Sequence, residues 1–87
     1  MYRGNTDSNQ KQIVKDLRRC GYSVISLHGV GSGVPDLIVC NSTNCRLVEI
    51  KTKEGRLSQS QIEFMAKWKG PKIPGCTTVE EVLEVFK

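Results

Sequence analysis

Residues 35–51 read PDLIVCNSTNCRLVEIK, and this stretch decides the fold. Its two apolar runs are separated by residues 41–44, whose sequence Asn-Ser-Thr-Asn is typical of a turn. Proline at position 35 is tolerated at the start of a strand but not in its centre. The stretch therefore predicts a β-hairpin that begins at Pro35 and ends near Lys51.

The second strand of this hairpin alternates between apolar and charged side chains. Val48 and Ile50 belong to one face, and Glu49 and Lys51 belong to the other. We expect the apolar face to be buried and the charged face to remain accessible. Asp36 lies at the start of the first strand, so a tight hairpin places it near Glu49.

Two converging carboxylates repel each other unless a positive charge lies between them, which favours a bound cation. Asp36 and Glu49 are therefore candidate metal ligands, with the backbone carbonyl of Ile50 as a third oxygen. Such oxygen ligands suit magnesium or manganese. A metal held there polarises a phosphate and acidifies a bound water. Lys51, on the same face, is expected to orient that water and to offset charge in the transition state.

The flanking sequence predicts further elements around the hairpin. Apolar residues recur at helical spacing over 13–20, after Thr6, Asp7 or Ser8 as a candidate N-cap, and 22–27 is typical of a strand. The expected order is helix, three strands, helix, short strand, helix. This order predicts one α/β domain over residues 1–87, with a mixed β-sheet flanked by helices.

A capping box is predicted at the start of the second helix. Ser58 is followed three residues later by Gln61, whose side chain is expected to reach back to the cap. Ile62, Met65 and Ala66 then form the expected apolar side of this helix. The last helix is expected over residues 77–86.

The charge of the chain suits a polyanionic partner. The chain has 13 basic and 9 acidic side chains, a net charge of +4. Residues 77–87 hold one basic and three acidic side chains, which leaves 12 basic and 6 acidic, or +6, over residues 1–76. A basic body favours DNA or RNA, although many basic proteins bind no nucleic acid.

The four cysteines show no CxxC pair, and no apolar stretch has secretory or membrane-spanning length. We therefore expect free thiols, a cytoplasmic location and no membrane partner. A structural zinc site from Cys40, Cys45 and the two distant cysteines is a further alternative. The glycine-rich residues 29–33 lack the lysine and spacing of a nucleotide-binding loop, so no nucleotide cofactor is expected.

These motifs resemble those of a known family. Pro35-Asp36, twelve intervening residues and Glu49-Ile50-Lys51 resemble the PD-(D/E)XK nuclease signature. Residues 33–39, 48–52 and 55–58 together with Gln61 resemble the VRR-NUC (virus-type replication-repair nuclease) family, and the resemblance extends over about residues 10–86.

The resemblance implies a restriction-endonuclease-like core and hydrolysis of phosphodiester bonds with Mg²⁺ or Mn²⁺. It implies that Asp36 and Glu49 are metal ligands, that Lys51 is the catalytic lysine and that Gln61 lies near the site. Compact members are typical of phages, are similar to Holliday-junction resolvases and act as homodimers. Branched DNA is then the expected substrate, and the host cytoplasm the expected location for a phage-encoded protein.

Members of the family commonly carry a glutamate on the first helix, and this chain has none there. Asp7 is the candidate substitute, and water in its place is the alternative. Lys53 and Arg56 are the candidate DNA contacts, together with Ser32 and Gly33 of the glycine-rich loop. A nucleic-acid-binding module that keeps the fold without catalysis is the competing interpretation.

Overall fold

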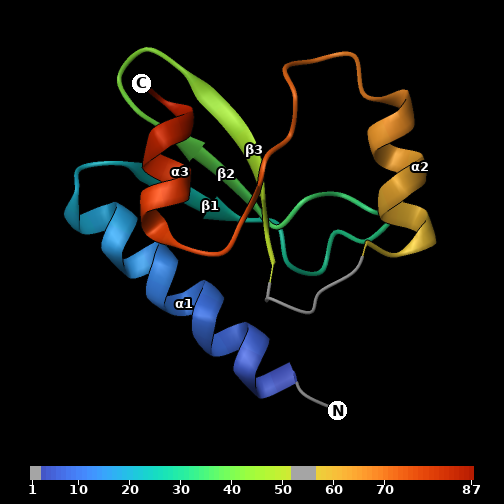
Figure 1. The fold of residues 1–87 in the computed structure, drawn as a ribbon, viewed down its shortest axis with the longest axis horizontal. Coiled ribbons are helices and arrows are strands. Elements are labelled where there is room, and N and C mark those ends of the chain that lie inside the picture. Colours follow the sequence, from blue (N-terminus) through green and yellow to red (C-terminus); the bar gives the residue numbers. More distant parts are fainter. Residues whose placement is uncertain (1–2, 52–56) are drawn as a thin grey trace.

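The computed structural model describes residues 3–51 and 57–87, and for residues 3–8 it describes the backbone alone. The described elements follow the expected order and confirm a mixed α/β architecture (Figure 1). In chain order they are α1 (Arg3–Arg19), β1 (Ser23–Ser26), β2 (Leu37–Cys40), β3 (Cys45–Ile50), α2 (Gln59–Lys67), β4 (Gly75–Cys76) and α3 (Val79–Val85).

The four strands form one mixed sheet in the order β1-β2-β3-β4. β1 pairs with β2 and β2 with β3 in antiparallel fashion, whereas β4 runs parallel to β3. The predicted hairpin is therefore confirmed as β2 and β3. Asn41 closes its turn, because its Oδ1 accepts hydrogen bonds from the backbone N–H groups of Thr43 (2.9 Å) and Asn44 (2.7 Å).

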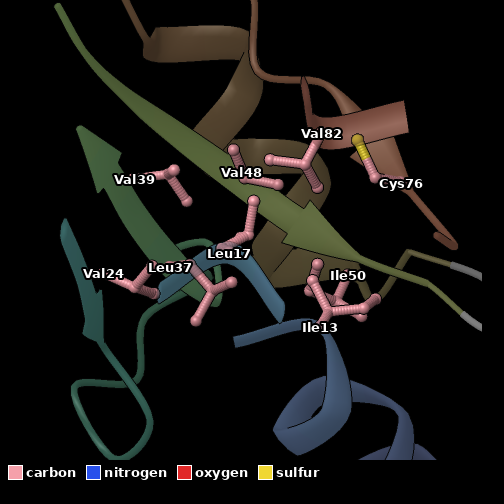
Figure 2. Packing of buried hydrophobic residues seen from close by; sticks show 9 residues of the cluster. All are labelled: Ile13, Leu17, Val24, Leu37, Val39, Val48, Ile50, Cys76 and Val82. Atoms are coloured by element: carbon pink, nitrogen blue, oxygen red, sulfur yellow. The ribbon is translucent and has the colours of Figure 1, made fainter. Parts of the chain in front are cut away.

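The hydrophobic core lies between one face of this sheet and two helices (Figure 2). α1 contributes Ile13 and Leu17 at helical spacing, and α3 contributes Val82. The sheet contributes the alternate residues of its strands, which leaves the opposite side chains outside the core. These buried strand residues are Val24, Leu37, Val39, Val48, Ile50 and Cys76.

α2 lies apart from α1 and α3 (Figure 1) and does not enter this core. The residues of its expected apolar side are not buried: Met65 is half-buried, Ala66 is exposed and Ile62 is 47% exposed. The physical reason is that α1 and α3 already cover the apolar face of the sheet. The capping box itself is confirmed, with Ser58 as N-cap and Gln61 reaching back to it.

The start of α1 also differs from the expectation. The helix begins at Arg3, so none of Thr6, Asp7 and Ser8 is its N-cap. Extending a helix by one residue is much easier than starting one, so polar residues that favour caps are absorbed into an existing helix. In the last helix, α3, Thr78 is the N-cap, and its hydroxyl oxygen accepts a 3.2 Å hydrogen bond from the N–H of Glu81.

The expectation of four free thiols was wrong for two of them. Cys40 and Cys45 are directly opposite in the β2–β3 register, with Cα atoms 4.0 Å apart, and form a disulfide. Two of the four sulfurs needed for the alternative zinc site are therefore bonded to each other. Cys20 is free and exposed, and Cys76 is free and buried. No helix in the described part of the chain is long and apolar enough to cross a membrane.

Candidate active site

Asp36 is fixed just before β2 by three neighbours. Pro35 is fully buried, which anchors the backbone on one side. The carbonyl oxygen of Asp36 accepts a 2.8 Å hydrogen bond from the N–H of Leu27, directly after β1. Its Oδ2 accepts a second 2.8 Å hydrogen bond from the N–H of Ile50 on β3. The carboxylate is therefore held across the hairpin by Ile50, the residue whose own carbonyl is the candidate third ligand.

Glu49 lies opposite Asp36, because Leu37 pairs with Val48 in the hairpin register. Its side chain is 6% exposed, so the expectation of an accessible carboxylate was wrong. Gln61 of α2 donates from Nε2 to Glu49 Oε2 at 2.6 Å and covers that oxygen. The other oxygen, Oε1, is buried and has no hydrogen-bond partner among the described residues.

Burial raises the affinity of both carboxyl groups for protons, and at Glu49 the charge of Asp36 adds to this effect. Loss of hydration raises the pKa of Glu49 to about 7, and the charge of Asp36 contributes to this rise while the hydrogen bond from Gln61 opposes it. Burial also raises the pKa of Asp36, against the lowering effects of the hydrogen bond from Ile50 and the charge of His28. Two carboxyl groups with raised pKa values at one site are typical of functional sites.

Lys51 follows β3 directly, and its N–H donates to the carbonyl of Cys76 at 2.8 Å. Its side chain lies across Gly75 of β4, where a Cβ would stand 2.9 Å from the Lys51 Nζ atom. Burial raises the pKa of the Cys76 thiol, and the ammonium group of Lys51 opposes that rise. The structure therefore brings Asp36, Glu49 and Gln61 together, and directs the Lys51 amine towards β4.

The glycine-rich loop packs against α2. Gly33 has φ +79°, and a Cβ there would overlap the backbone carbonyl of Ser60. This close approach gives Gly33 a packing role that sequence spacing did not suggest. Ser32 is exposed with φ +57°, and it borders a hollow of about 410 Å³ beside α2.

Three predicted site residues are not placed by the structure. Lys53 and Arg56 lie outside the described residues. The backbone of Asp7 belongs to α1, but its side chain is not described. Among the residues whose side chains are described, no three His, Cys, Asp or Glu residues are grouped so that they could hold a metal ion.

This arrangement has a counterpart among known proteins. A solved structure described as a VRR_NUC domain superposes with a TM-score of 0.65 and 23% sequence identity, covering 93% of this chain and 92% of that one. This likeness supports the fold. No curated protein matches the chain. The model of the VRR-NUC domain matches residues 3–77, most of the sequence. The chain belongs to the VRR-NUC family.

The VRR-NUC family is a family of nucleases, so the resemblance noted in the sequence is confirmed. The matched range contains Asp36, Glu49, Lys51 and Gln61.

Sequence reasoning missed two neighbours of the site. His28 follows a strand and precedes a glycine-rich loop, which indicates an ordinary loop residue, yet its charge acts on Asp36. The contact between Gly75 and Lys51 joins residues 24 positions apart and leaves no local sequence signal.

Proposed function

We propose that this VRR-NUC protein is a divalent-metal-dependent endonuclease of the PD-(D/E)XK type that cleaves branched DNA, with four-way Holliday junctions as the preferred substrate. The observation that carries the proposal is the buried Oε1 atom of Glu49 beside Asp36, which has no hydrogen-bond partner among the described residues. A buried carboxylate oxygen without a hydrogen bond is costly, and a cation at this position removes that cost.

The residues fit a hard divalent cation. Asp36 and Glu49 supply carboxylate oxygens, and Ile50 supplies the candidate backbone carbonyl. Mg²⁺ and Mn²⁺ retain several water ligands, so two protein carboxylates are an adequate donor set. Gln61 contributes by holding one oxygen of Glu49 at 2.6 Å, which leaves the other oxygen for the cation. Asp7 on α1 remains the candidate for an additional ligand.

Each side chain of the site then has its own role in hydrolysis. When bound, the cation supplies Lewis-acid polarisation of the phosphate and a more acidic water. Asp36 and Glu49 would hold the cation as carboxylates, so binding would require them to lose the protons that their raised pKa values favour. Lys51, whose amine lies over Gly75, is the side chain that would orient the attacking water and offset the negative charge that develops. Lys53, Arg56 and Ser32 serve as contacts for the DNA backbone.

We further propose that the protein acts as a homodimer. The face of the sheet opposite the core presents a row of apolar residues, because the register sets Ile25 beside Ile38 and Ile38 beside Leu47. Ile25 is 57% exposed, and Trp68 beyond the row is 38% exposed. Exposed apolar area of this kind supports self-association, and a two-fold axis presents two sites to a symmetric junction. Light scattering tests this proposal, since a dimer has twice the 9.7 kDa mass of the chain.

The deciding experiment is cleavage of a labelled four-way junction in Mg²⁺ and in Mn²⁺, with linear duplex and flap substrates beside it. Paired nicks on the junction that require metal and disappear in Asp36→Ala are the expected result. Asn41→Ala, a change in the hairpin turn away from the carboxylates, serves as a variant that retains cleavage. An intact junction in both metals would contradict the proposed activity.

A binding module without turnover is the second candidate. Two observations favour it: only two acidic side chains converge among the residues described in full, and the Lys51 amine is directed towards Gly75. Calorimetric titration with Mn²⁺ discriminates between the two. Saturable binding that Asp36→Ala abolishes supports the nuclease, whereas tight junction binding without metal uptake supports the binding module.

A further inference from the structure

A basic surface lies along α1, away from the carboxylate pair. An open groove of about 770 Å³ runs between α1 and the end of β1. Lys11, Lys15, Arg18 and Arg19 line it from the helix, and His28 lines it from the loop after β1. None of the described residues that line it is acidic, so the groove concentrates positive charge.

The spacing on α1 explains this concentration. Lys11, Lys15 and Arg18 follow one another at intervals of four and three residues, and Arg19 lies four residues after Lys15. The four side chains therefore share one side of the helix, beside its buried stripe. Like charges four residues apart, such as Lys11 and Lys15, repel each other and destabilise a helix. A polyanion in the groove would reverse this repulsion.

The helix dipole accounts for only part of the pattern. Arg18 and Arg19 lie in the last turn of α1, where positive charge is favourable. Arg18 also donates to the carbonyl of Val24 at 2.9 Å, and Arg19 lies 3.8 Å from Asp16. Lys11 and Lys15 lie in earlier turns of α1 and are exposed, so the helix dipole does not account for them.

The groove continues towards the proposed reaction centre. His28 forms its wall on the loop side, and the preceding residue, Leu27, is hydrogen-bonded to the backbone of Asp36. Lys11 and Arg18 are seven residues apart, or about 10 Å along the helix axis at 1.5 Å per residue. Basic side chains over that length can contact successive phosphates of one strand.

We propose that the groove between α1 and β1 binds the phosphodiester backbone of the nucleic-acid substrate. The bound segment is next to the phosphodiester bond that is cleaved at Asp36 and Glu49. This proposal rests on the proposed nuclease function and extends it, because it assigns a binding surface to Lys11, Lys15 and His28. The substrate then contacts the protein at α1 as well as at the glycine-rich loop.

The test is the affinity of a Lys11→Ala/Lys15→Ala variant for a fluorescent four-way junction, measured by anisotropy over a series of salt concentrations. The buffer contains EDTA, so that binding is measured without cleavage. Lys69→Ala/Lys87→Ala is the matched control, because both residues are exposed and lie outside the groove. Alanine favours helix, so the groove variant is expected to fold, and circular dichroism checks this.

The groove variant is expected to bind at least about tenfold more weakly, and the slope of log K against log salt to become shallower by roughly 1–2. The control is expected to match the wild type. If the groove variant and the control bind the junction with equal affinity and equal salt dependence, the proposed role of the groove is wrong, even if the wild type cleaves the junction. Loss of binding in the groove variant, with no cleavage by the wild type in any metal, would support the groove and contradict the nuclease. If the groove variant changes its oligomeric state but not its affinity for the junction, the proposal is also wrong, because the groove would then bind a second copy of the chain.

Discussion

Gln61 donates a 2.6 Å hydrogen bond from its Nε2 atom to Glu49 Oε2, while its Oε1 atom accepts a 2.8 Å hydrogen bond from the N–H of Ser58. One side chain therefore closes the capping box of α2 and fixes a carboxylate on β3. The two roles are linked, because the cap sets the direction in which the amide points. Gln61 was expected either near the site or in the capping box, and the structure shows it in the capping box and hydrogen-bonded to Glu49.

Gln61→Ala is expected to reduce junction cleavage by about tenfold to a hundredfold, because Glu49 loses the bond that orients it. Ser58→Ala is the matched control. It removes the hydroxyl that accepts from the Gln61 N–H at 3.2 Å but keeps its own backbone N–H. The control is expected to lose about 1 kcal/mol of stability and to retain cleavage well below its melting temperature. Equal losses of cleavage in Gln61→Ala and Ser58→Ala would show that the effect of Gln61 arises from helix capping and not from its bond to Glu49.

Lys51→Ala is expected to abolish cleavage and to leave junction binding within about twofold of the wild type, since one charge among many contributes little to affinity. Single-turnover cleavage and anisotropy on the same junction measure the two effects. Lys69→Ala removes an equivalent charge from an exposed position and is expected to behave as the wild type. Cleavage that survives Lys51→Ala would remove this lysine from the mechanism.

Gly33→Ala is expected to destabilise the protein by about 1–3 kcal/mol, measured by urea unfolding. The backbone there has φ +79°, and the new Cβ would overlap the Ser60 carbonyl, so either the loop or α2 must move. Cleavage is expected to fall with stability, because α2 carries Gln61. Gly31→Ala is the matched control: it has the same φ of +79° but open space around the Cβ position. A loss of equal size in both variants would indicate that backbone strain, and not the contact with Ser60, is responsible.

The stability of the metal-free protein is expected to fall as pH rises from about 4.5 to about 7. Burial raises the pKa of Glu49 from 4.5 to about 7, so between these values the folded state holds more protons than the unfolded state. The decrease is up to about 3 kcal/mol at 1.36 kcal/mol per pKa unit, and stability levels off above pH 7. Glu49→Gln is expected to lose this component and to retain the part due to Asp36, whose pKa is also raised.

Melting temperatures in EDTA between pH 4 and pH 8 measure the difference between the wild type and Glu49→Gln. The wild-type curve is expected to descend more steeply through this interval. Parallel curves would contradict a raised pKa at Glu49. Mn²⁺ affinity is expected to rise over the same interval, because the metal displaces the protons that these carboxyl groups retain.

Local sequence patterns determined the hairpin, the order of elements and the proximity of the two carboxylates. Turn residues after Cys40 and alternation through β3 act over a few positions, so the sequence alone predicts that Asp36 and Glu49 are neighbours. The Ser58–Gln61 capping box has the same local character. The boundaries of α1 were less predictable, because a helix that has formed extends through residues that prefer caps.

Only the tertiary structure decided how this site is enclosed. Glu49 is buried because α2 lies over it, and α2 is positioned by Gly33 against Ser60 and by the hydrogen bond of Gln61. Such contacts join residues 12 or more positions apart, and chain packing rather than periodicity sets their geometry. The same holds for the groove that Lys11 of α1 and His28 line together, because charge spacing on a helix does not reveal which loop it faces. Local sequence patterns identified the candidate residues of the site. Tertiary contacts determined how far those residues are buried and therefore how readily they ionise.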